Sequence, residues 1–261
     1  MNHAVFIRGG VDGFPVSSGM IFHFDASSTN YLYTDAGTTN VTSNGQSIYR
    51  WKSKFSNNYF DQATLSSRPT YTTGGLNGKS YALFDGINDR MEMPWSSEFA
   101  TNARSFFAVM TPGISNAGTT YPYFFSLGQA TKGTQLYMYN NNPKYWEFSQ
   151  GSWGVNYVDS STSNYGDNVS KVLVGRSQSP TNPTGLRLWV SGTETTAASI
   201  SGSVDYGTPP RAILGGEPDG TTSVRNISQM RMYEWGIFNR YISDSERDLI
   251  ANYLRSKYSI T

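Results

Sequence analysis

Short runs of apolar and aromatic residues, separated by turn residues, restrict this chain to a many-stranded fold. From Met20 onward the runs include MIFHFDA, SFFAVMTP, YPYFFSLG, TQLYMYN, SKVLVGR, GLRLWVSG and SQMRMYEWGIF. Gly, Pro, Asn or Ser lie between them, and the runs recur about every 10–20 residues. This pattern predicts an all-β fold, a two-sheet antiparallel jelly-roll sandwich, rather than alternating strands and helices.

One helix is predicted, and it lies close to the C-terminus. Ser243 and Glu246 have the spacing of a capping box, in which each side chain bonds to the other residue's backbone N–H. An apolar stripe at helical spacing follows, formed by Leu249, Ile250, Tyr253 and Leu254. We therefore expect the sandwich to end in a short helix.

The length of 261 residues fits one large β-sandwich, and no internal repeat or linker divides the chain. We expect residues 19–261 to form the sandwich. Residues 1–18, rich in Gly and without clear periodicity, are interpreted as an extended N-terminal arm. Phe6, Ile7 and Phe14 would anchor this arm on a partner subunit, and a disordered tail is the alternative.

Charge and cysteine content narrow the classes of partner. Charged residues make up 15% of the chain, the formal net charge is +1, and no Lys/Arg run is present, which argues against nucleic acid. The chain has no cysteine, so disulfides and thiolate metal sites are excluded. The sequence shows no secretory signal and no apolar stretch of about 20 residues, so we expect no membrane span.

Ordered motifs along nearly the whole chain resemble one family of β-sandwiches. The clearest is the run Leu83-Phe84-Asp85-Gly86-Ile87-Asn88-Asp89, followed by Met91 and Met93. The other motifs, in order, are Phe22 to Ala26, Trp51, Ala63-Thr64 with Arg68-Pro69-Thr70, Leu186 to Gly192, Ile213 to Gly216, and Met232 to Tyr258. Their order resembles that of the concanavalin A-like lectin/glucanase superfamily, in particular its laminin-G-like jelly rolls, which also occur in bacteriophage virion surface proteins.

The resemblance implies two curved sheets, a habit of binding carbohydrate or protein, and in some members a calcium ion. A calcium ion, the one cofactor that we consider, would be held by Asp85 and Asp89, with Asp25 nearby, because hard cations prefer oxygen ligands. The same residues are also ordinary turn formers. We favour the turn, and expect no other metal or cofactor.

The sequence carries little catalytic equipment. Sandwich glucanases of this superfamily carry an E-x-D-x-E strand motif, which is missing here, and Glu92, Glu147 and Glu234 are isolated in their predicted strands. The two histidines, His3 and His23, do not suggest a catalytic triad or a zinc site. We therefore predict that the protein is not an enzyme.

An aromatic-rich segment is the candidate binding surface. Tyr137, Tyr139, Trp153 and Trp189 are the rings that we expect outside the sandwich core. Alternation along a strand places Tyr137 and Tyr139 opposite Leu136 and Met138, and places Trp189 opposite Leu186 and Leu188. Asn140 and Asn141 lie beside them in the sequence and would bind sugar hydroxyls. A subunit interface and plain core packing are the alternatives.

These observations lead to a primary hypothesis and two alternatives. The primary hypothesis is a non-enzymatic virion surface protein of a bacteriophage, either a capsid decoration or a tail-associated protein, with a glycan-adhesion role. Its partners would be the capsid or tail subunit, further copies of itself in a homo-oligomer, and surface polysaccharide. The alternatives are a free or cell-surface carbohydrate-binding, lectin-like module and a glycoside hydrolase.

Overall fold

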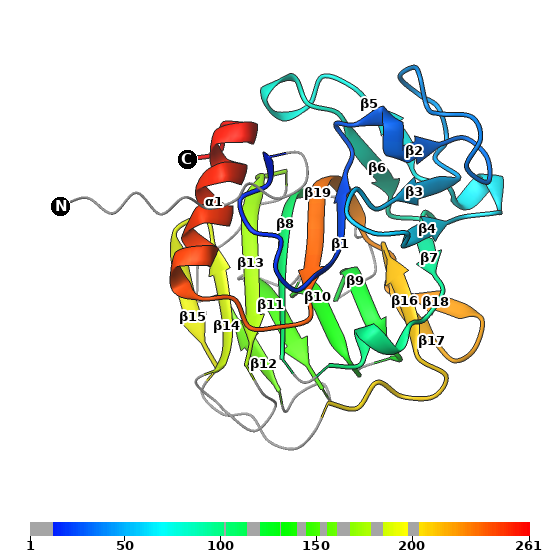
Figure 1. Ribbon diagram of the computed structural model, residues 1–261. Coiled ribbons are helices and arrows are strands. Elements are labelled where there is room, and N and C mark those ends of the chain that lie inside the picture. The colour runs from blue at the N-terminus through cyan, green and yellow to red at the C-terminus, as the bar shows by residue number, and fades with distance from the viewer. Residues whose placement is uncertain are drawn as a thin grey trace.

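The computed structural model describes residues 13–101, 103–113, 121–130, 132–139, 145–151, 156–160, 168–178, 185–197 and 204–261. Within these ranges the chain forms two large antiparallel sheets, a small hairpin and one α-helix (Figure 1). Single-turn 3-10 helices lie in the loops at Thr29–Tyr31, Leu65–Ser67, Leu76–Gly78 and Ser97–Phe99.

The first sheet, sheet A, has the long strand β19 (Gln229–Phe238) near its centre. In spatial order its main path is β15 (Thr193–Thr196), β14 (Leu186–Val190), β13 (Lys171–Ser177), β8 (Arg104–Pro112), β19, β6 (Tyr81–Asp85) and β5 (Thr70–Thr72). One edge of β19 pairs with β8. Two strands share the other edge: β6 pairs with the first residues of β19, and β1 (Met20–Asp25) pairs with the remaining ones.

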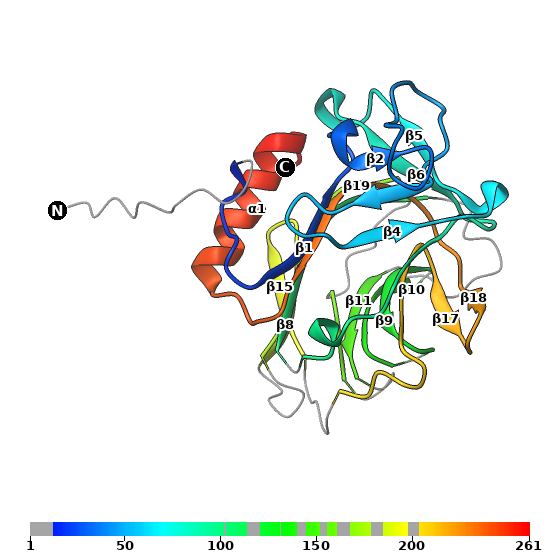
Figure 2. The same cartoon turned by 45° about the vertical axis from the view of Figure 1, so that its right-hand side comes forward.

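The second sheet, sheet B, packs face to face with sheet A (Figure 2). In spatial order it contains β12 (Tyr157–Asp159), β11 (Tyr145–Gln150), β10 (Thr134–Tyr139), β9 (Tyr123–Gly128), β16 (Arg211–Leu214), β7 (Met91–Met93), β4 (Tyr59–Asp61), β3 (Arg50–Lys52) and β2 (Leu32–Tyr33). A separate hairpin, β17 (Glu217–Asp219) and β18 (Ser223–Arg225), follows β16.

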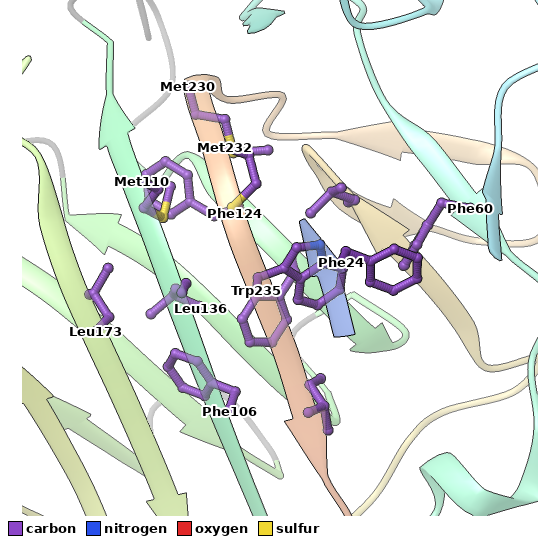
Figure 3. Close-up of a cluster of buried hydrophobic side chains, with 14 of the residues drawn as sticks. Phe24, Phe60, Phe106, Met110, Phe124, Leu136, Leu173, Met230, Met232 and Trp235 are labelled. Carbon is purple, nitrogen blue, oxygen red and sulfur yellow. The ribbon is translucent and has the colours of Figure 1, made fainter. Parts of the chain in front are cut away.

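The core between the sheets is rich in aromatic rings (Figure 3). The ring of Trp235, on β19, stacks on Phe24 and on Phe125, each at a centroid distance of 5.4 Å. Phe106 of sheet A meets Phe148 of sheet B edge to face at 5.0 Å. Each fully buried side chain of this size stabilises the fold by about 1.5–3 kcal/mol, so these contacts hold the two layers together.

Helix α1 (Asp244–Tyr258) covers the face of sheet A that points away from sheet B (Figure 2). Its N-terminus has the predicted capping box: Ser243 Oγ accepts from the Glu246 N–H at 3.2 Å, and Glu246 Oε2 accepts from the Ser243 N–H at 2.8 Å. The buried side chains of Ile250 and Leu254 pack on sheet A in a second apolar cluster. The sandwich and its C-terminal helix are therefore confirmed.

The segment before β1 differs from the expected arm where the structure describes it. Phe6 and Ile7 lie outside the described residues. Phe14 is only 2% exposed, because its ring stacks on Phe107 at 4.7 Å and meets Tyr253 of α1 at 5.3 Å. The expectation that Phe14 anchors a partner subunit is therefore wrong, since its own chain buries the ring.

Candidate functional site

The outer face of sheet B, where β4, β7 and β16 meet, carries the most promising set of polar side chains. On β4 the buried Phe60 points to the core, so Tyr59 and Asp61 point outward. Glu92 of β7 alternates with two buried methionines and lies opposite Asp61 in the register. Arg211 begins β16 and reaches the same surface, where it binds Glu92.

These outward side chains line a pocket of about 480 Å³, which we call the outer groove. Loop residues before and after β7 and at the tip of the β17–β18 hairpin complete its walls. The lining residues are Tyr59, Asp61, Gln62, Ala63, Arg90, Glu92, Met93, Pro94, Trp95, Pro210, Arg211 and Thr222. A smaller pocket of about 180 Å³ adjoins it on the other side of Tyr59, toward Arg50 and Lys52.

Both carboxylates of the outer groove are held by arginines in two-pronged ion pairs. Arg211 donates from Nε and Nη2 to the two oxygens of Glu92, each at 2.8 Å. Arg50 donates in the same way to Asp61, with both distances at 2.7 Å. The hydrogen bond to Asp61 raises the pKa of Arg50. Such pairs fix the carboxylates in orientation and leave lone pairs for a ligand's hydroxyl groups.

Two aromatic rings lie among these polar groups. Trp95 is half-buried, and its ring rests against Phe99 and Tyr206 at centroid distances of 5.5 and 5.4 Å. The guanidinium carbon of Arg50 lies 3.9 Å from the centroid of the Tyr59 ring. These contacts restrain both rings, so a ligand would meet aromatic surfaces that are already positioned.

The aromatic surface predicted from the sequence is differently arranged. Tyr137 does lie outside the core between the sheets, but it is fully buried. Its ring stacks on Tyr123 at 4.6 Å, and its hydroxyl donates to Glu147. Tyr139 is half-buried and stacks on Tyr145 at 4.8 Å. Tyr137 therefore cannot present an open stacking face, because neighbouring side chains on the same sheet already use it.

Trp189 is also covered. It points away from the inter-sheet core, as predicted, but it is 7% exposed and belongs to the apolar cluster beneath α1. The expectation of a ring available to sugar or protein is wrong here, because the helix occupies that face of sheet A. Trp153, Asn140 and Asn141 lie outside the described residues.

A pair of carboxyl groups lies beside the buried tyrosines. Glu147 on β11 is directly opposite Asp159 on β12. Burial raises the pKa of Glu147 to about 7, with the hydrogen bond from Tyr137 opposing this shift and the charge of Asp159 adding to it. Burial also raises the pKa of Asp159 to about 6. The three glutamates singled out in the sequence do not converge: Glu92 binds Arg211, Glu147 meets Tyr137, and Glu234 lies on the other sheet.

Glu234, on β19, is the centre of a buried polar network under α1. Its carboxylate accepts from His23 Nε2 at 2.7 Å, Lys257 Nζ at 2.6 Å and Tyr258 Oη at 2.8 Å. Lys257 also reaches Asp25 at 2.8 Å. All these groups satisfy one another, so the network joins β1, β19 and α1 and offers no open polar group to a substrate.

The three aspartates considered for calcium do not gather. Asp85 Oδ1 accepts from the backbone N–H groups of Ile87, Asn88 and Asp89 at 2.8–3.1 Å, which is the capped turn that we favoured. Asp25 pairs with β19 five residues beyond the partner of Asp85, a separation of about 16 Å along the strand. Within the described ranges, no group of three or more His, Cys, Asp or Glu side chains could hold a metal ion.

Sequence reasoning missed the outer groove. Tyr59 and Asp61 flank a buried residue, and Glu92 stands between two methionines, so their outward direction was readable from alternation. Their meeting with Arg211 was not readable, because Glu92 and Arg211 are 119 residues apart and meet only through the pairing of β7 with β16.

No protein-family model and no curated protein matches the chain. Solved structures do resemble it. Trypanosoma rangeli sialidase in complex with sialic acid is 14% identical, with a TM-score of 0.57 over 93% of this chain and 34% of that one. Domain 4 of AbnA, an extracellular arabinanase from Geobacillus stearothermophilus in complex with arabinotriose, is 12% identical, with a TM-score of 0.53 over 89% and 98%.

A third similar structure is the binding domain of Botulinum Neurotoxin DC in complex with SialylT, at 11% identity and a TM-score of 0.52 over 92% of this chain and 52% of that one. The likeness is one of fold. This chain corresponds to about a third of the sialidase chain and to nearly all of the arabinanase domain. The neighbours are consistent with a two-sheet, jelly-roll β-sandwich.

Proposed function

We propose that the protein is a carbohydrate-binding module and that its ligand lies in the outer groove. The observation that carries the proposal is the composition of that pocket, which combines Tyr59 and Trp95 with carboxylates held by arginines. The structural neighbours support the same class, because two of them are complexes with arabinotriose and with SialylT.

The chemistry of a sugar matches these walls. A pyranose ring has apolar C–H faces that pack on aromatic rings, and hydroxyls at its rim that both donate and accept hydrogen bonds. The carboxylates of Asp61 and Glu92 accept from such hydroxyls, and the main-chain groups of the loops add further partners. The volume of about 480 Å³ is in the usual range for a small-ligand pocket and has room for a short oligosaccharide segment.

A glycan array followed by calorimetry tests the proposal. We expect wild-type protein to bind at least one glycan, and Trp95→Ala to weaken that binding at least tenfold, since a central aromatic contact is lost. Trp95→Phe, which keeps a stacking ring, should recover part of the affinity. Tyr157→Ala is the matched control, because Tyr157 is 37% exposed on the same sheet but outside the groove.

Melting temperatures of the variants separate binding from folding, because Trp95 also packs on Phe99. Loss of binding with an unchanged melting temperature supports the groove. Equal binding by wild type, Trp95→Ala and Glu92→Gln contradicts it. An array without any bound glycan contradicts the proposed function itself.

We infer binding without catalysis at this groove. Each of its carboxylates is already engaged by an arginine through both oxygens, so neither is arranged as a proton donor to a glycosidic oxygen. Prolonged incubation with a bound oligosaccharide should release no reducing ends. Release that disappears in Glu92→Gln would instead identify a hydrolase.

The placement of this module on a bacteriophage virion, as a capsid decoration or tail-associated adhesin, is a further proposal. Its support is the low charge and the missing cysteine of the sequence, together with the glycan-binding role that we infer. Within the described part of the chain, no helix is long and apolar enough to cross a membrane. Labelling of purified particles with an antibody against the protein tests the placement, and unlabelled particles contradict it.

A further inference from the structure

Arginines near the outer groove follow a common pattern of hydrogen bonding. Arg50 and Arg211 each use the Nε–Nη2 edge of the guanidinium to bind both oxygens of a carboxylate, Asp61 and Glu92 respectively. In each of them Nη1 donates to a main-chain oxygen, which fixes the direction of the group. This edge is the part of arginine whose two parallel N–H groups match a carboxylate.

Arg90 is held through Nη1 in the same way, but its Nε–Nη2 edge binds no carboxylate among the described residues. Its Nη1 donates to the main-chain oxygen of Asn88 at 3.1 Å and lies 3.5 Å from Ser67 Oγ. Its own backbone is held as well, because its N–H donates to the oxygen of Ser67 and its oxygen accepts from Gln62. Among the residues that the structure describes, no carboxylate lies within ion-pair distance of Arg90, and its Nε and Nη2 have no hydrogen-bond partner.

The position of Arg90 places that edge where a ligand would be. Arg90 immediately precedes β7 and lies two residues before Glu92, at a separation of about 7 Å along the chain, and both residues line the outer groove. The other charged residues of the groove are matched, since Asp61 pairs with Arg50 and Glu92 with Arg211. Arg90 therefore contributes the one unmatched charge among the described groove residues.

We propose that the Nε–Nη2 edge of Arg90 binds the carboxylate of an acidic sugar, so that the ligand of the outer groove is an acidic glycan. This inference rests on the proposed function and adds the class of glycan. Asp61 and Glu92 already show the geometry that the ligand's carboxylate would adopt on its arginine. The neighbouring ring of Trp95 packs on the same sugar or on the next one.

The test uses pairs of glycans that differ only in their charge. The pairs are oligogalacturonate with its methyl ester, glucuronate-terminated with glucose-terminated oligosaccharides, and 3′-sialyllactose with lactose. In at least one pair, wild-type protein should bind the acidic member at least tenfold more tightly. Arg90→Gln should remove most of this preference, because the affinity for the acidic member falls much further than the affinity for its neutral partner.

Two further variants serve as controls. Arg231→Gln removes the same charge from an exposed position on sheet A, outside the outer groove, and should change neither affinity. Arg90→Lys keeps the charge but loses the paired N–H groups, so it should retain only part of the preference. Melting curves establish whether each variant is folded. If Arg90→Gln does not fold, the comparison of wild type with Arg90→Lys tests the inference.

The outcomes separate this inference from the proposed function. If wild type binds both members of every pair equally, or if Arg90→Gln and Arg90→Lys keep the full preference, the inference is overturned while glycan binding stands. Dextran sulfate tests whether the site prefers a carboxylate. If dextran sulfate binds as tightly as the acidic sugar, Arg90 belongs to a general anion site and the carboxylate site is contradicted. If wild type binds no glycan, acidic or neutral, both proposals fail.

Discussion

Lys257 is the side chain whose removal should most sharply test how the buried network supports the fold. Its Nζ lies 2.8 Å from Asp25 Oδ2 and 2.6 Å from Glu234 Oε2. The two carboxylate side chains are 3% and 0% exposed and lie directly opposite each other on β1 and β19. We predict that Lys257→Met lowers the free energy of unfolding, because it leaves two like charges buried side by side.

The magnitude follows from what remains after the change. Removing one partner of a buried ion pair typically costs about 3–5 kcal/mol. Asp25 keeps Lys54 at 3.2 Å, and Glu234 keeps His23 and Tyr258, so we expect the lower end, about 3 kcal/mol. For a chain of this size each kcal/mol shifts the melting temperature by about 2–4 °C, which gives a fall of about 6–12 °C.

Calorimetry at pH 7 measures this fall, and Lys132→Met is the matched control. Lys132 forms an ion pair of 2.7 Å with Asp205, but the two side chains are 41% and 50% exposed. Exposed pairs contribute about 0–1 kcal/mol, so the control should melt within about 4 °C of wild type. Equal shifts in the two variants, or a shift below 2 °C in Lys257→Met, would refute the reasoning.

The pH dependence gives an independent check. Burial alone would raise the pKa of Asp25, but Lys257, Ser27 and Lys54 together outweigh it and hold that pKa below the ordinary range. The resulting stability is present above about pH 4 and is lost as the pH falls through the lowered pKa. Burial alone would lower the pKa of Lys257, but Glu234 and Asp25 raise it. This contribution is present below about pH 10 and is lost as the pH rises further.

Other substitutions probe other parts of the sandwich. Because burial raises the pKa of Glu147 to about 7, its ionisation destabilises the fold as the pH rises from about 4 to 7. Glu147→Gln should therefore be about 1–3 kcal/mol more stable than wild type at pH 8 and equal to it at pH 4, measured by urea unfolding; a deficit at pH 8 contradicts this. Gly175→Ala should cost about 3 kcal/mol, since the added Cβ would lie 1.9 Å from Cε1 of Phe106 on the neighbouring strand; an unchanged melting temperature would show that the Phe106 ring can move aside. Ser243→Ala should cost about 1 kcal/mol of unfolding free energy by removing the helix cap, and Ser243→Asp should not.

The fold was largely readable because its signals are local. In the strand 186–190, alternation predicted that Leu186 and Leu188 point inward and Trp189 outward, and all three do. The capping box placed the start of α1 at Ser243. The exposure of Trp189 could not be predicted from the sequence, because it depends on where the helix lies across sheet A.

The candidate site could not be predicted from the sequence, because it depends on the pairing of strands that are far apart in the chain. Arg50 and Asp61 face each other across adjacent strands of one sheet, and a hairpin pattern hints at such a pair. No sequence motif distinguishes Arg90 from the other arginines. Arg90 is a candidate because its Nε–Nη2 edge has no partner among the described residues. This difference can be recognised only when the partners of the neighbouring arginines are known.

The position of β19 has a consequence for how the chain folds during synthesis. This strand, 229–238, forms the centre of sheet A and pairs with β1, more than 200 residues earlier. Until the ribosome has released residues 229–238, β1 and β6 have no partner on that side, and their edges stay open to other chains. We therefore expect this sheet to fold slowly once β19 has emerged, and to need chaperones or low concentration, as is usual where long-range strand pairing dominates.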